Sequence, residues 1–298
     1  HAKDDRVAYS LWKVLCLRVG LRVVFAYRPD WERSRQLVNA VGVDVIGGLR
    51  PEQRTALDGQ TVLFTANPPF ASSPYTQQTR PYDPLTSFVP VIRVGSVPLV
   101  LVTSSRSPFE TFEQMKQWVL AHPDKANYAH SGAGSPGQLF IEYIKQPAGL
   151  EVLTAIAYKS TGEAATDLVG GTTLLNLVSY PAIAPHLKSG AVKLLAVGSA
   201  QRMKDYPKVP TLGELIAQPD FEASVWYGAF LPAGTPAEHV ARIQEYFAKA
   251  HKSASVADFM QRSHIEASVL GPQEFSAAPR RDADIARRTV ELANAKTR

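Results

Sequence analysis

The middle of the chain repeats one pattern: a short apolar run, a polar turn, and a stretch with helical periodicity. NYAH at 127–130 precedes SPGQLFIEYIKQ, EVLTAIAY at 151–158 precedes STGEAATDLVGG, and TTLLNLVSY at 172–180 precedes PAIAPHLKSG. Apolar runs of strand length that alternate with helices are typical of βα units. No other feature constrains the fold as strongly as this repeated pattern. The pattern predicts an α/β architecture with mostly parallel sheets.

Outside this region, further apolar runs predict strands and amphipathic stretches predict helices. The run VPVIRVGSVPLVLVTS at 89–104 predicts two strand pieces that are broken at Gly95 and Pro98. The other expected strands are at 21–27, 58–66, 192–199, 222–236 and 265–270. The other expected helices are at 4–20, 110–125, 237–252, 256–264 and from about 272 onward.

Composition narrows the class of protein. The 298 residues suit one large domain or two medium ones, and Cys16, the single cysteine, excludes an internal disulfide bond. The net charge of +5 comes from scattered Lys and Arg residues rather than a basic tract, so we expect no nucleic-acid partner. The apolar runs are of strand length, so the sequence predicts no membrane span, and no signal peptide is visible.

Three helix starts carry the signature of a capping box. They are Ser135-Pro136-Gly137-Gln138, Ser160-Thr161-Gly162-Glu163 and Thr235-Pro236-Ala237-Glu238. In a capping box, the first side chain accepts from the third helical N–H and the third side chain reaches back. Most such boxes only prevent a helix end from fraying.

The first two helix starts follow strands directly, which is where open α/β sheets bind ligands. Free N–H groups and the positive end of the helix dipole point there. Gly132 and Gly134 allow the backbone to approach a ligand closely. Hydroxyl groups come from Ser131, Ser135, Ser160 and Thr161. Together these features predict a cradle for a carboxylate or another small anion.

The stretch at 132–137 also imitates two catalytic or cofactor motifs. It fits G-x-G-x-x-G, but a dinucleotide site wants an acidic residue at the end of the next strand, and Glu151 stands at that strand's start. It is one residue away from G-x-S-x-G, but Pro136 lacks the N–H that would form half of the oxyanion hole. A hydrolase that uses Ser135 therefore remains only a weak alternative.

Metal sites and cofactors have no support in the sequence. The seven histidines are dispersed, there is no H-E-x-x-H, and one cysteine cannot form a thiolate cluster. We therefore expect no metal, no cofactor and no catalytic residue.

Six blocks of sequence together resemble one family, the tripartite tricarboxylate transporter substrate-binding proteins, also called the Bug family. The blocks are RPYDPLTSFVPVIRVGSVPLVLV, ANYAHSGAGSPGQL, AYKSTGEAATDLVGG, LKSGAVKLLAVGSAQR, VPTLGEL and WYGAFLPAGTP. The resemblance runs from about Asp58 to the C-terminus. It implies a type II periplasmic-binding-protein fold with two α/β domains around a central cleft. We place domain 1 at 1–100 plus 227–298 and domain 2 at 101–226.

The resemblance also implies a function. It implies a monomeric periplasmic receptor that closes on a small organic acid (a dicarboxylate, an amino acid or an aromatic acid) and delivers it to integral-membrane permease subunits, without catalysis. Carried over by position, the ligand contacts of domain 2 would be Ser131, Gly132, Gly134, Ser135, Tyr158, Ser160, Thr161, Ser179 and Tyr180. Those near the hinge and from domain 1 would be Trp226, Thr65, Ala66 and Asn67. Trp226 could equally be a core residue.

The N-terminal part departs from the family pattern. The family opens with a strand and a P-F-x-x-G-G-x-x-D loop, whereas this chain begins HAKDD, so we expect the N-terminal strand of domain 1 to be missing. A second glycine-rich loop is replaced by RPDWERSRQ, whose arginines could supply anion contacts or form a solvated helix start. These departures leave open a degenerate receptor that acts through protein–protein contact in sensing.

Overall fold

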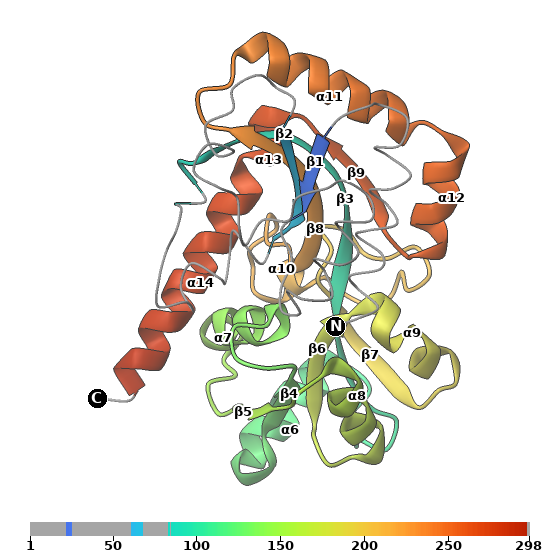
Figure 1. Ribbon diagram of the computed structural model, residues 1–298. Helices are drawn as coiled ribbons and strands as arrows, with labels where there is room; N and C mark the ends of the chain where they lie inside the picture. The colour runs from blue at the N-terminus through green and yellow to red at the C-terminus, as the bar shows by residue number, and fades with distance from the viewer. Residues whose placement is uncertain (1–21, 26–60, 68–82, 84, 297–298) are drawn as a thin grey trace. The chain divides into compact units, whose positions relative to one another are not determined.

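The structure, a computed structural model, describes residues 22–25, 61–67, 83 and 85–296 (Figure 1). It forms two compact units. Unit 1 contains the described residues of His1–Ser96 and Trp226–Asp284, and unit 2 contains those of Val97–Val225 and Ile285–Arg298. Three elements run from one unit into the other: β3 (Phe88–Ser104), β8 (Ser224–Pro232) and α14 (Ala277–Lys296).

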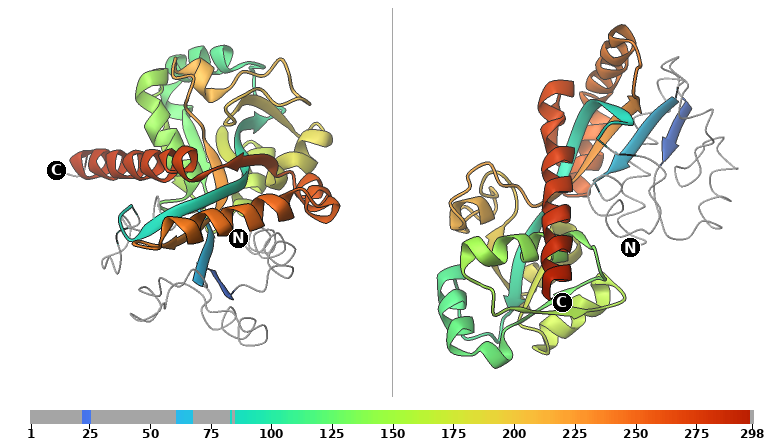
Figure 2. Two further views of the ribbon diagram at one scale, coloured as in Figure 1. Left: turned by 90° about the horizontal axis from the view of Figure 1, so that it is seen from above. Right: turned by 90° about the vertical axis from the view of Figure 1, so that its left-hand side faces the viewer.

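Unit 1 is built on a mixed sheet in the order β1-β2-β8-β3, with β9 also paired to β3. β1 and β2 are parallel and lie side by side (Figure 2), whereas β2 pairs antiparallel with β8 and β3 pairs antiparallel with β9. Its elements are β1 (Arg22–Phe25), β2 (Thr61–Ala66), α11 (Ala237–His251), α12 (Ala254–Arg262), β9 (Glu266–Leu270) and α13 (Pro272–Phe275).

Aromatic side chains form much of the core of unit 1. Trp226 is fully buried, and its ring meets that of Phe275 edge-on with the centroids 5.1 Å apart. Phe64 on β2 stacks on Phe247 of α11 at 6.0 Å, so α11 covers one face of this sheet. Edge-on and offset contacts of this kind add to the burial of apolar area.

Unit 2 is built on strands in the order β3-β6-β4-β5, with β7 also paired to β3. β4 is parallel to both β5 and β6, and β3 is antiparallel to β6 and β7. Its elements are α6 (Phe112–Ala121), η1 (Pro123–Lys125), β4 (Asn127–His130), α7 (Pro136–Ala148), β5 (Thr154–Ala157), α8 (Thr161–Gly170), β6 (Leu175–Ser179), α9 (Tyr180–Lys188), β7 (Val192–Val197) and α10 (Leu212–Leu215).

The predicted α/β class is confirmed, but two details of the prediction are wrong. The described ladders are mixed rather than mostly parallel, because β3 pairs antiparallel with each of β6, β7 and β9. The run at 89–104 is one continuous strand rather than two pieces. Gly95 lies within this strand and does not break it. β9 lies so close to Gly95 that a Cβ at this position would come within 2.9 Å of Glu266 O. The glycine permits close packing instead of a turn.

The N-terminal and C-terminal parts of the chain compare differently with the prediction. The expected helix at 4–20 and the replaced loop RPDWERSRQ lie outside the described residues. At the other end, α14 begins in unit 1, and its residues from Ile285 onward group with unit 2. There Thr289 Oγ1 donates to Leu139 O of α7 at 3.4 Å. In the part of the chain that the structure describes, no helix is both long and apolar enough to cross a membrane.

Candidate functional site

The carboxyl ends of three strands of unit 2 lie at the same edge of its sheet. β4 lies between β5 and β6 and is parallel to both. Because parallel strands end at the same edge, the helices α7, α8 and α9 that follow them all begin there. We call residues 131–135, 158–161 and 179–180, which connect these strands to their helices, the unit 2 cradle. Most of its residues are half-buried.

The first loop of the cradle is fixed by its neighbours. His130, the last residue of β4, is buried, and its Nδ1 lies 2.9 Å from Gly132 O. Because a carbonyl oxygen only accepts, Nδ1 carries the proton in this contact. Gly132 and Gly134 have φ values of 110° and 75°, which glycine adopts without strain. Gln138 accepts from Gly134 N at 2.7 Å. The loop is therefore held in one shape before any ligand arrives.

Ser135 precedes α7 but does not cap it, so the first predicted capping box is wrong. Its side chain makes no capping hydrogen bond, and Gln138 reaches back to Gly134 instead of to Ser135. Ser135 Oγ is buried and finds no hydrogen-bond partner among the described residues. An unpaired buried hydroxyl costs free energy, so this group is poised for a partner that enters the cradle.

The start of α8 is capped by the protein itself. Ser160 Oγ accepts from Glu163 N at 3.2 Å, as the second capping box predicts. The carboxylate of Glu163 reaches back one residue further than expected and accepts from Lys159 N at 3.1 Å. Of the three cradle helices, only α8 carries an acidic residue in its first turn.

Tyr158 uses its hydroxyl within its own βα unit. The hydroxyl donates to Asp167 Oδ2 on α8 at 2.8 Å, and the main-chain N donates to His130 O at 2.8 Å. Desolvation and the hydrogen bond to Asp167 raise the pKa of Tyr158 to about 12. The phenol of Tyr158 therefore stays neutral and its proton is used by Asp167. The main-chain hydrogen bond to His130 links the loop at 158–161 to the loop at 131–135.

The third loop offers a hydroxyl and main-chain donors. Ser179 is half-buried and makes no capping bond to α9. Tyr180 is only 4% exposed and packs in the core of unit 2, where its ring meets that of Tyr206 edge-on. Burial and the hydrogen bond with Tyr206 raise the pKa of Tyr180 to about 12. Tyr180 can therefore reach a ligand through its main chain, and its side chain serves the core.

Two of the four residues expected near the hinge and from domain 1, Asn67 and Trp226, bind a carboxylate that the sequence did not single out. Asn67 Nδ2 and Trp226 Nε1 donate to Asp282 Oδ2 at 3.0 and 2.8 Å. Thr65 is buried and its hydroxyl donates to Ala66 O at 3.2 Å. Trp226 is thus a core residue whose polar tip is satisfied. Asp282 lies 215 positions from Asn67, so no local signal in the sequence could have linked them.

The third predicted capping box, in unit 1, is also wrong. α11 begins at Ala237 with Pro236 as its N-cap residue, and Pro236 has no side-chain oxygen that could accept. Thr235 Oγ1 donates instead to Pro232 O at 2.8 Å, which stabilises the turn after β8. The T-x-x-E pattern at 235–238 marked the position of a helix start, but not its hydrogen bonds.

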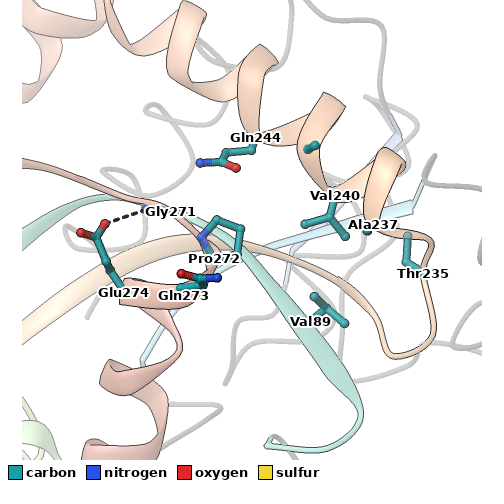
Figure 3. Close-up of a pocket in the computed structure, with 10 residues that line it drawn as sticks. Val89, Thr235, Ala237, Val240, Gln244, Gly271, Pro272, Gln273 and Glu274 are labelled. Carbon is teal, nitrogen blue, oxygen red and sulfur yellow. Dashed lines mark hydrogen bonds between the residues drawn. The ribbon is translucent and has the colours of Figure 1, made fainter.

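Unit 1 also contains a groove between α11 and α13, with a volume of about 580 Å³ (Figure 3). Val89, Val240 and Pro272 contribute apolar side chains to its lining, and Gln244 and Glu274 contribute polar ones. None of the predicted ligand contacts is among the described residues that line it. Of those described residues, only Glu274 is charged, and its carboxylate would repel an organic anion.

Comparison with known proteins shows the family of this chain. Residues 39–283 match the family described as "Tripartite tricarboxylate transporter family receptor". The chain belongs to this family. BugT of Bordetella pertussis is 31% identical over 221 residues, which cover 74% of this chain and 67% of BugT. A UPF0065 protein of Bordetella bronchiseptica is 33% identical over 215 residues, which cover 69% of this chain and 63% of that protein. The chain thus spans about two thirds of the length of these curated relatives.

Solved structures show the fold of this receptor family. A TctC solute-binding protein from Polaromonas has a TM-score of 0.73 at 20% identity, over 91% of this chain and 98% of that one. Rpa4515 of R. palustris, solved with adipate, has a TM-score of 0.66 at 23% identity, over 93% and 98%. MatC of Rhodopseudomonas palustris, solved with malate, has a TM-score of 0.61 at 20% identity, over 91% and 98%. The predicted binding-protein fold is confirmed.

In the described residues, the unit 2 cradle shows neither the serine–base contact of a hydrolase nor a cluster of metal ligands. A nucleophilic serine needs a base within hydrogen-bond reach, and in the described residues Ser135 Oγ has no such contact. Among the same residues, no group of three or more His, Cys, Asp or Glu side chains could hold a metal ion. The geometry instead presents main-chain N–H groups and hydroxyls at one edge of a sheet.

Proposed function

We propose that this protein is a periplasmic receptor that binds a small organic carboxylate in the unit 2 cradle and releases it unchanged. The observation that carries the proposal is the convergence of three helix N-termini beside the buried, unpaired hydroxyl of Ser135. Helix N-termini supply N–H donors and a positive potential, which suit an anion. Two proteins of the same fold were solved with the carboxylic acids adipate and malate, which supports this class of ligand.

Some of the proposed residues would contact the ligand through their side chains, and others through their main chains. In unit 2 we assign side-chain hydroxyls of Ser131, Ser135, Ser160, Thr161 and Ser179, with main-chain groups of Gly132 and Tyr180. We propose that Gly134 and Tyr158, whose main-chain N–H groups donate to Gln138 and His130, shape the cradle around the ligand. From unit 1 we propose Thr65, Ala66, Asn67 and Trp226, at the end of β2 and the start of β8, as further ligand-binding residues. Asp282 then holds Asn67 and Trp226 in place through its hydrogen bonds.

The remaining parts of the proposal rest on membership of the receptor family. We propose that the protein acts as a monomer, that the domains are 1–100 plus 227–298 and 101–226, and that it delivers its ligand to integral-membrane permease subunits. No metal or cofactor takes part, because neutral donors suffice to bind a carboxylate without transforming it.

A thermal-shift screen tests the binding function. Malate, succinate, glutarate, adipate, acidic amino acids and aromatic acids are added to the purified protein at millimolar concentration. A ligand present at 100 times its Kd is expected to stabilise the folded state by about 2.7 kcal/mol, which raises the Tm by several degrees. Ser135→Ala should weaken that stabilisation. If no organic acid raises the Tm of the wild-type protein, the proposed function is contradicted.

A further inference from the structure

We propose that the unit 2 cradle holds a single carboxylate between the starts of α7 and α9, and that Glu163 excludes a second carboxylate from the start of α8. This inference rests on the proposed function, because it divides the same site among its three helices. It adds a residue that determines specificity and a narrower class of ligand.

The first turns of the three helices differ in charge. Glu163 lies in the first turn of α8, whereas α7 and α9 have no acidic residue there. The carboxylate of Glu163 accepts from Lys159 N, so a negative charge already sits where the helix end would attract an anion. A ligand carboxylate at this position would meet like charge.

The first turn of α7, unlike that of α8, contains no negative charge. The residue that reaches back from its first turn is Gln138, which is neutral and accepts from Gly134 N at 2.7 Å. Beside it, Ser135 Oγ is buried and finds no partner among the described residues. The start of α7 therefore combines a free hydroxyl donor, an unopposed dipole and no negative charge.

The start of α9 lies close enough to that of α7 for both to contact the same carboxylate. β4 and β6, which lead into these helices, are adjacent and parallel. A Cβ at Gly137 would lie 2.2 Å from Leu177 O, so the first turn of α7 lies directly against β6. Ser179 at the end of β6 makes no capping bond, so its hydroxyl can also face an anion. The two uncharged helix starts thus flank one position.

The ligand class follows from this division. One carboxylate sits between α7 and α9, and the part of the ligand that faces α8 is uncharged or cationic. The hydroxyl of Ser160 accepts from Glu163 N, which leaves its own proton for a ligand oxygen. Hydroxy acids, half-amides and amino acids satisfy this pattern better than an acid with two carboxylates held within unit 2.

Two isosteric substitutions test the assignment, with two controls. Gln138→Glu adds a negative charge at the start of α7, and Gln138→Ala removes the same hydrogen bond without adding charge. Glu163→Gln removes the negative charge at the start of α8 while keeping an acceptor for Lys159 N. Glu113→Gln removes a charge of the same kind from the first turn of α6, which follows the end of β3 at the opposite edge, since β3 is antiparallel to β6.

Isothermal titration at neutral pH and low salt would measure the Kd of succinate, glutarate and adipate and of the half-amide of each acid. We expect Gln138→Glu to weaken binding of every ligand that the wild type binds by about tenfold, and more than Gln138→Ala does. Glu163→Gln should shift the preference from half-amide to dicarboxylate by about three- to tenfold. Glu113→Gln should shift it by less than about twofold.

Each other outcome overturns the inference. If Glu163→Gln leaves the preference between dicarboxylate and half-amide unchanged, Glu163 does not determine specificity. If Gln138→Glu weakens binding no more than Gln138→Ala, the carboxylate does not sit at α7. If the wild type binds none of the six ligands and no acid of the thermal screen, the proposed function itself fails, and that result is distinct from the first two.

Discussion

At Asp282, one buried carboxylate joins several elements of unit 1. It accepts from Asn67 at the end of β2, from Trp226 on β8 and from Arg281 beside it on α14. Asp282 is 2% exposed, so its oxygens depend on these donors rather than on water. Removing the carboxylate would take an acceptor away from several buried donors at once, and the loss of a buried acceptor costs free energy.

We expect Asp282→Ala to lower the free energy of unfolding by about 3 kcal/mol, because it removes the buried acceptor that Trp226 Nε1 and Asn67 Nδ2 share. Asp282→Asn keeps an oxygen for these donors and should cost less than half as much. Urea denaturation followed by tryptophan fluorescence measures both. An equal loss in the two variants would contradict this role of the carboxylate oxygen.

The same residue predicts a pH dependence. Burial raises the pKa of the Asp282 carboxyl, against the opposing attraction of Arg281. Because the folded state then holds a proton that the unfolded chain has lost, the contribution of Asp282 to stability falls as pH rises above about 3.9. The unfolding free energy of wild type minus that of Asp282→Asn should therefore decrease between about pH 4 and pH 7. An increase over this range would contradict the raised pKa.

At the scale of elements, α7 and α8 are alike in sequence but differ in how closely they approach the sheet. Both have glycine as the second residue of the helix, Gly137 and Gly162. A Cβ at Gly137 would lie 2.2 Å from Leu177 O, whereas a Cβ at Gly162 would meet nothing nearer than 3.9 Å. The first glycine permits helix–strand contact, and the second has open space.

This difference predicts opposite effects of the same substitution. Gly137→Ala should destabilise the protein by about 2–3 kcal/mol, because α7 must move away from β6. Gly162→Ala should be neutral or stabilise by up to about 1 kcal/mol, because alanine favours the helix. Thermal or urea unfolding of the two variants checks this. Similar effects of both substitutions would contradict the close approach of α7.

These elements also show how far the sequence predicts the site. The βα units at 127–188 could be predicted because apolar run, turn and helix signals agree locally. The position of the helix starts followed, and with it the cradle. The hydrogen-bond partners of the side chains could not be predicted, because those of Ser135 and Gln138 depend on the geometry of the loop. Tyr180 likewise turns into a core that Tyr206 completes from a distant segment.

At the scale of the whole molecule, the chain passes between its two units through β3, β8 and α14. Such connections are typical of proteins whose domains move about a hinge. The grouping of 285–298 with unit 2 carries no local sequence signal, because it depends on contacts such as that of Thr289 with Leu139, which lie 150 positions apart.

The place where the carboxylate binds can be tested by a backbone NMR titration of the whole, isotope-labelled chain with an organic acid that raises its Tm. If the unit 2 cradle binds the carboxylate, the amide signals of Gly137, Gln138 and Tyr180 should shift with saturation at the Kd found by calorimetry. Those of Gln244 and Gly271 in the unit 1 groove should stay unchanged. Saturable shifts confined to the groove, with a silent cradle, would contradict binding in unit 2.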